Sequence, residues 1–112
     1  MDLRDKILFK PPEVGCVLSL TGLPSGGSKI CDRSPYGNMG TITGATWNRL
    51  PSGLWCLSFD GNDDWVNCGD KASLSPADII TVEAWLNPAT VSGDHFCLSK
   101  TKSNAGGGYS IF

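Results

Sequence analysis

Residues 57–69 read LSFDGNDDWVNCG, so a dense group of polar residues stands between two short apolar runs. On each side of the group, apolar and polar residues alternate, and side chains that alternate point to opposite faces of an extended chain. The Gly-Asn-Asp sequence at 61–63 contains the residue types that dominate turns. The stretch therefore predicts two strands, at residues 54–59 and 64–68, joined by a turn rich in carboxylates.

The same pattern of short apolar runs and turn residues recurs along the whole chain. Gly and Pro together make 14 + 7 = 21 of the 112 residues, and charged residues make 18%, below the usual ~25%. This composition is typical of an all-β protein with many turns. The pattern predicts strands at residues 7–9, 16–20, 40–43, 54–59, 64–68, 79–87, 96–101 and 109–112.

The longest predicted strand is IITVEAWLN at residues 79–87. Its alternation predicts one core-facing side, formed by Ile80, Val82, Ala84 and Leu86. The opposite side mixes an indole with a carboxylate, a hydroxyl and an amide, which is typical of a solvent face or of the floor of a binding groove. Two sheets packed through such apolar faces form a β-sandwich. Just before this strand, residues 75–78 predict one helical turn, capped by Ser75 with Pro76 in first position.

Charge and cysteine usage exclude several classes of function. The formal net charge is -2, the pI is about 5.1, and no stripe of Lys and Arg is present, so nucleic acid is not an expected partner. No window approaches eighteen apolar residues, and the first residues lack the apolar core of a signal peptide. The five cysteines lack the C-x-x-C pairs of a zinc site, and their odd number leaves at least one unpaired. Buried thiols and one or two disulfides both remain open.

Three segments in order carry a family resemblance: CDRSPYGNMGTITGATW from residue 31, LSFDGNDDWVNCGDKASLSPADIITVEAWLNP from residue 57, and HFCLSK from residue 95. They resemble the N-terminal half of a laminin G-like domain of the concanavalin A-like lectin/glucanase superfamily. The resemblance covers roughly residues 16–112. In one departure, Met39 stands where relatives commonly have histidine.

The resemblance implies a jelly-roll sandwich of antiparallel sheets. We expect an N-terminal arm or first strand at residues 1–15 and the N-terminal portion of the jelly roll at residues 16–112. Domains of this family continue for several more strands, so we expect an apparently incomplete sandwich that a second chain or a second copy completes. The family also favours an extracellular, cell-surface or virion-surface location.

Relatives in this family often hold a structural calcium between oxygen-rich loops, and Ca²⁺ takes six to eight oxygen ligands. The corresponding candidate ligands in this sequence are Asp32, Asn38, Asp60, Asp63 and Asp64. In the alternative interpretation, Asp60 and Asp63 brace the turn as Asx-turns and Asp64 pairs with a neighbour across the strands.

The candidate ligand-binding residues are those of an exposed aromatic with polar neighbours, which suits a sugar ring: Trp85, Glu83, Asn87 and Trp47. Trp55 and Trp65 are expected to be mostly buried. Glu83 is the only carboxylate on its strand, whereas a glycosidase needs two, so we expect no enzyme. The sequence therefore predicts a noncatalytic binding or adhesion module that recognises carbohydrate or a protein surface. The alternative is a structural protein that assembles into a surface layer, virion or oligomer and binds no small ligand.

Overall fold

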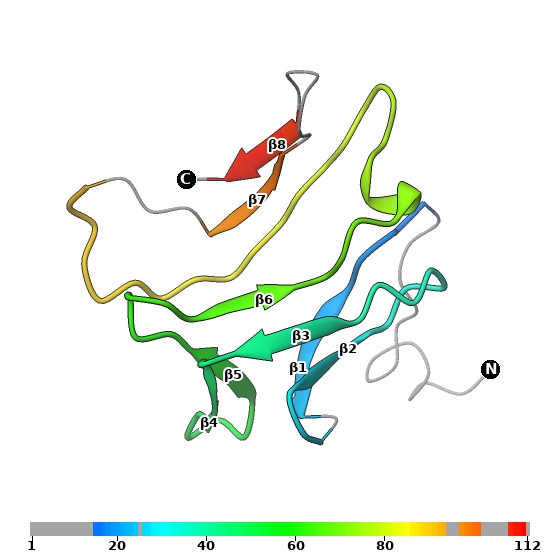
Figure 1. Cartoon of the computed structure of the whole chain (residues 1–112). Coiled ribbons are helices and arrows are strands. Elements are labelled where there is room, and N and C mark those ends of the chain that lie inside the picture. The colour runs from blue at the N-terminus through cyan, green and yellow to red at the C-terminus, as the bar shows by residue number, and fades with distance from the viewer. Residues whose placement is uncertain (1–14, 25, 94–96, 102–107, 112) are drawn as a thin grey trace. The chain divides into compact units, whose positions relative to one another are not determined.

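The structure is a computed structural model that describes residues 15–24, 26–93, 97–101 and 108–111. Nearly all of its regular structure is antiparallel β-sheet, which confirms the all-β prediction (Figure 1). The chain divides into two compact units, Met1–Leu74 and Ser75–Phe112, and each is described by itself.

The first unit is built on a four-stranded sheet with strand order β1-β2-β3-β6. All neighbouring strands in it are antiparallel. The chain leaves this sheet after β3, forms a separate two-stranded ribbon, and returns to pair β6 with β3. The bounds of the four strands are β1 Leu20–Pro24, β2 Lys29–Asp32, β3 Gly40–Thr43 and β6 Trp65–Asn67.

The register of this sheet aligns the core residues. Ile30 lies opposite Gly40, and Ile42 lies opposite Val66, so these four positions share one face. A Cβ on Gly40 would come within 2.6 Å of Ile30 Cγ2 and 2.5 Å of Val66 Cγ1, so only glycine fits there. The buried apolar residues Ile30 and Ile42 are joined by Leu74 of the 3₁₀ turn η1, Ala72–Leu74.

The separate ribbon pairs β4, Thr46–Arg49, with β5, Trp55–Ser58. Trp47 lies opposite Leu57 in this ribbon, so this candidate ligand-binding residue is part of a paired strand. The guanidinium of Arg49 lies 5.7 Å from the ring centroid of Trp55, within the range of a cation–π contact.

The second unit contains the hairpin of β7, Leu98–Thr101, and β8, Gly108–Ile111. The strand expected at residues 79–87 is not formed: residues 79–88 are neither strand nor helix. No described strand pairs with this segment, and alternation yields a strand only where a neighbour completes the hydrogen-bond ladder. Three of the four residues of the expected core face are exposed, Leu86 at 61% and Ile80 at 39% among them, while Val82 is half-buried.

Several smaller expectations also change. The helical turn lies at η1, before the predicted residues 75–78. Trp65 is 53% exposed, because its strand β6 points this side chain away from the core face that holds Val66. All five thiols are free; Cys31 and Cys97 are exposed and the other three are half-buried. The strand predicted at residues 7–9, and His95, lie outside the described residues.

Candidate functional site

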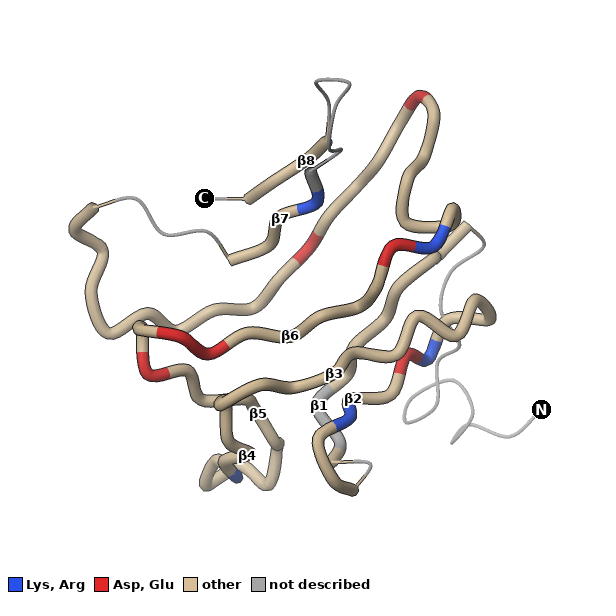
Figure 2. The backbone as a smooth tube through the Cα atoms, in the orientation of Figure 1, with Lys and Arg blue, Asp and Glu red and all other residues tan. Residues whose placement is uncertain are grey.

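The acidic turn predicted from the sequence connects β5 to β6, and Figure 2 shows the acidic positions grouped there. Asp60, Asp63 and Asp64 each offer a carboxylate oxygen, and these oxygens lie within 4.8 Å of one another. Asp60 and Asp63 are exposed and Asp64 is half-buried. Five described residues elsewhere are Lys or Arg, and they form no continuous basic stretch: Lys29, Arg33, Arg49, Lys71 and Lys100.

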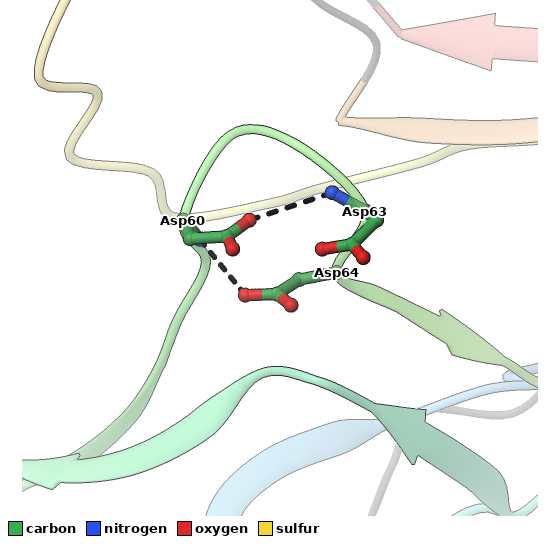
Figure 3. A group of neighbouring side chains, drawn as sticks. All are labelled: Asp60, Asp63 and Asp64. Atoms are coloured by element: carbon green, nitrogen blue, oxygen red, sulfur yellow. Dashed lines mark hydrogen bonds between the residues drawn. The ribbon is translucent and has the colours of Figure 1, made fainter.

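Backbone hydrogen bonds use two of these three carboxylates (Figure 3). Asp60 Oδ1 accepts the N–H of Asn62 at 2.8 Å and that of Asp63 at 3.4 Å, which is an Asx-turn. Asp64 Oδ2 accepts the N–H of Asp60 at 2.8 Å and so closes the turn. The bracing role weighed from the sequence is confirmed for Asp60. The N–H of Asn62, acting on the charged carboxylate, is the main cause that holds the pKa of Asp60 below its ordinary value.

The acidic turn also depends on a glycine in the neighbouring connection. Gly44 follows β3 directly and has φ +81°, a left-handed conformation that glycine adopts readily. A Cβ at this position would overlap Asp64 Oδ1. Gly44 therefore leaves the space that the Asp64 carboxylate occupies. The sequence analysis missed this residue, although its Thr43–Gly44 position after a strand is a turn signal.

The second acidic turn is organised around Asp32, a buried carboxylate at the end of β2. Asp32 Oδ1 accepts the N–H groups of Ser19 at 2.8 Å and Ser34 at 2.9 Å. Asp32 Oδ2 accepts the hydroxyl of Ser34 at 2.6 Å and the N–H of Asn38 at 2.8 Å. Four donors thus surround one carboxylate, and a cation would have to compete with all of them.

Asn38 extends this network to two other segments. It is 1% exposed, and its Nδ2 donates to Val17 O at 2.7 Å and to Ser73 Oγ at 2.9 Å. Its Oδ1 is buried and has no hydrogen-bond partner among the residues that the structure describes. Asn38 therefore connects the chain before β1, the loop between β2 and β3, and η1.

The surroundings of Asp32 and Cys68 shift the pKa values of both side chains. Burial acts to raise the pKa of Asp32, but the Ser34 hydroxyl and the N–H groups of Ser19, Ser34 and Asn38 outweigh it, so the pKa lies below its ordinary value. Burial raises the pKa of the nearby Cys68 thiol, and the negative charge of Asp32 raises it further. Asp32 is therefore held charged, and Cys68 is held as the thiol.

The register of β3 keeps the two acidic turns apart. Asn38, whose N–H donates to Asp32 Oδ2, precedes β3 by two residues, and Gly44 just beyond the end of β3 lies against Asp64. Four residues of strand span roughly 13 Å. The structure therefore does not assemble the five predicted calcium ligands into one site. Asp60, Asp63 and Asp64 supply three side-chain ligands of the six to eight that Ca²⁺ requires, and two of these carboxylates already accept backbone N–H groups.

The predicted ligand-binding residues belong to two different units of the chain. Trp85 has a relative exposure of 102%, and Glu83 and Asn87 are also exposed, all in the second unit. Trp47, in the first unit, is half-buried, and its Nε1 is buried without a hydrogen-bond partner in the described part of the chain. The segment of residues 83–87 is thus the part of the predicted ligand site that is open to solvent.

Comparisons with family models, with curated proteins and with solved structures gave no match to this chain. The fold therefore defines only a broad class, the all-β proteins built of antiparallel strands. No helix in the described ranges has the length and apolar character needed to cross a membrane.

Proposed function

We propose that this chain is a noncatalytic recognition module that binds carbohydrate through the segment of residues 83–87. The observation that supports this proposal is the complete exposure of Trp85 between the exposed residues Glu83 and Asn87. An indole face packs against the C–H face of a sugar ring, while a carboxylate and an amide exchange hydrogen bonds with its hydroxyls.

The free protein does not gain the stabilisation that burial of the Trp85 ring would give. Burying a large apolar side chain yields ~1.5–3 kcal/mol relative to leaving it in water. Trp85 gains none of this in the free chain, because its ring is fully exposed. That free energy is available to a ligand that covers the ring.

We also propose the jelly-roll sandwich of the laminin G-like family as the fold. Two observations support it: the strand order β1-β2-β3-β6, in which the chain leaves the sheet and returns to it, and the additional antiparallel ribbons β4–β5 and β7–β8. An extracellular, cell-surface or virion-surface location belongs to the same proposal. A crystal structure in which the ribbons and the four-stranded sheet do not form two facing layers would contradict it.

A glycan array tests the proposed function. We expect the wild-type chain to bind a restricted set of glycans, and Trp85→Ala to lose that binding. Val91→Ala is the matched control, because Val91 is an exposed apolar residue of the same unit, 87% exposed, without an aromatic ring. Wild-type binding to no glycan, or equal binding by Trp85→Ala, would overturn the proposal. Repeating the array with a chelator separates any dependence on calcium.

A second function, assembly, is favoured by a different observation. Ile79 is 87% exposed and Leu86 is 61% exposed, in a segment with the alternation of a strand but no strand partner among the described residues. An unpaired strand sequence of this kind pairs readily with another chain. We propose, as the alternative, that residues 79–87 of one copy pair with a second copy. Light scattering should then show a dimer that Leu86→Asp dissociates, whereas a monomer at all concentrations would exclude this alternative.

A further inference from the structure

A cavity of about 300 Å³ lies within the second unit, between residues 75–80 and the β7–β8 hairpin. Its size falls at the lower end of the ~300–1,000 Å³ of small-molecule sites. The hairpin contributes Lys100, Gly108 and Tyr109 to its lining. The sequence analysis singled out none of these residues.

The hairpin presents two of these side chains together. Lys100 and Tyr109 are directly opposed in the β7–β8 pairing, so they lie on the same face of the ribbon. Both are half-buried, whereas Ser99 and Ser110, which are opposed one position away, are exposed. The ammonium of Lys100 and the phenol of Tyr109 thus belong to the covered face, which lines the cavity.

The opposite wall combines polar and apolar groups. Asp78 and Ser75 contribute a carboxylate and a hydroxyl, while Pro76, Ala77 and Ile79 contribute apolar surface. Residues 76–80 are exposed, so the cavity is open to solvent on this side. The lining therefore holds one cation and one anion and has no net charge. The two opposite charges favour neither a net cation nor a net anion over the cavity as a whole, and the lining offers donors, acceptors and an apolar surface to a neutral ligand.

We propose that this cavity is a binding site for a single neutral sugar ring. A pyranose has adjacent hydroxyls that both donate and accept, so one ring exchanges hydrogen bonds with the Asp78 carboxylate and the Lys100 ammonium at once. Its C–H face packs on the Tyr109 ring or on the apolar wall. This inference rests on the proposed carbohydrate-binding function, and it adds a second site with its own residues.

Protein-observed NMR tests the inference with three probes, each added separately to the full chain: glucose, galactose and mannose. We expect at least one hexose to produce saturable shifts of the amides of Lys100, Gly108 and Tyr109. Lys100→Ala should weaken this binding by roughly ten-fold or more, because hydrogen bonds to charged groups are the stronger ones. Tyr109→Phe keeps the ring and its packing, so it should weaken binding less. Ser99→Ala, on the opposite exposed face of β7, should leave it unchanged.

The outcomes separate the two proposals. Hexose shifts at no residue of the cavity, or equal affinity in Lys100→Ala, Tyr109→Phe and Ser99→Ala, would overturn the cavity site. If no hexose shifts the amides of Lys100, Gly108 and Tyr109 while Trp85→Ala loses glycan-array binding, the proposed function holds and the cavity inference fails. If the hexose binds the cavity while Trp85→Ala keeps array binding, the cavity inference holds and the role of Trp85 fails. An uncharged hexose that binds no better than its uronic acid would contradict the preference for neutral ligands.

Discussion

The carboxylate of Asp64 lies directly against the backbone of Gly44, so that a Cβ on Gly44 would overlap Asp64 Oδ1. Gly44 follows β3 and Asp64 precedes β6, and these two strands are neighbours in the sheet. The same carboxylate accepts the N–H of Asp60 through Oδ2 at 2.8 Å. One side chain thus links the connection after β3 to the acidic turn before β6.

Gly44→Ala should destabilise the protein by about 2–5 kcal/mol in urea unfolding. The left-handed φ of +81° accounts for ~1–2 kcal/mol of this, and the overlap with Asp64 adds ~1–3 kcal/mol. Gly61→Ala is the matched control, because Gly61 has φ +82° but a Cβ there meets nothing within 4 Å. Equal losses in the two variants would show that Asp64 does not occupy the space beside Gly44.

Asp32→Ala should lower the free energy of unfolding by about 2–4 kcal/mol, because it leaves four hydrogen-bond donors without their acceptor in a buried site. Asp63→Ala removes a carboxylate of the same charge from an exposed position and should change stability by less than ~0.5 kcal/mol. A loss in Asp32→Ala no greater than in Asp63→Ala would contradict the Asp32 network.

The pKa of Asp32 predicts a defined dependence of stability on pH. Because its pKa is lower in the folded than in the unfolded protein, the charged carboxylate stabilises the fold fully above the ordinary value of 3.8, and this stabilisation is lost as pH falls through the folded-state pKa. Urea unfolding from pH about 6 to about 2 should show this loss below pH about 4. Asp32→Asn should be less stable at neutral pH and should show a smaller acid-induced loss than wild type. Parallel curves for the two proteins would mean that Asp32 is not the group that titrates.

The two possible roles of the acidic turn, bracing and calcium binding, predict different effects of calcium on the melting midpoint. Bracing by Asp60 and Asp64 needs no ion, so we expect the same melting midpoint with millimolar calcium and with chelator. A ligand that binds only the folded state must raise stability by mass action. A midpoint that rises with calcium, and no longer rises in Asp63→Ala, would instead support ion binding at Asp60, Asp63 and Asp64.

The sequence predicted some of the paired strands and missed others; the strand predicted at residues 16–20 shares only Leu20 with β1, Leu20–Pro24. Residues 40–43 coincide with β3, and the predicted strands at 54–59, 64–68 and 96–101 contain β5, β6 and β7. The missed strands β2 and β4 are rich in polar residues: KICD contains two apolar residues and TWNR contains one. Their place in the sheet comes from pairing with β3 and β5, which no local pattern contains.

In the candidate site too, the sequence predicts contacts between residues that are close along the chain but not contacts between distant ones. Asp60 and its Asx-turn follow from local chemistry, because the acceptor and donor are two residues apart. The contact of Asp64 with Gly44, and that of Asn38 with Ser73, join residues 20 and 35 positions apart, and only the register of the strands determines them. The same holds for residues 79–87, where a regular alternation meets no described partner strand.

Amide hydrogen exchange of the free protein tests the central claim most directly, because the recognition role of Trp85 depends on an unpaired, open segment at residues 79–87. The account predicts that the amides of residues 81–87 exchange rapidly, while the amide of Ile42, within the paired strand β3, is protected. Protection at residues 81–87 equal to that of Ile42 would show that the segment forms a paired strand after all, and it would contradict the account.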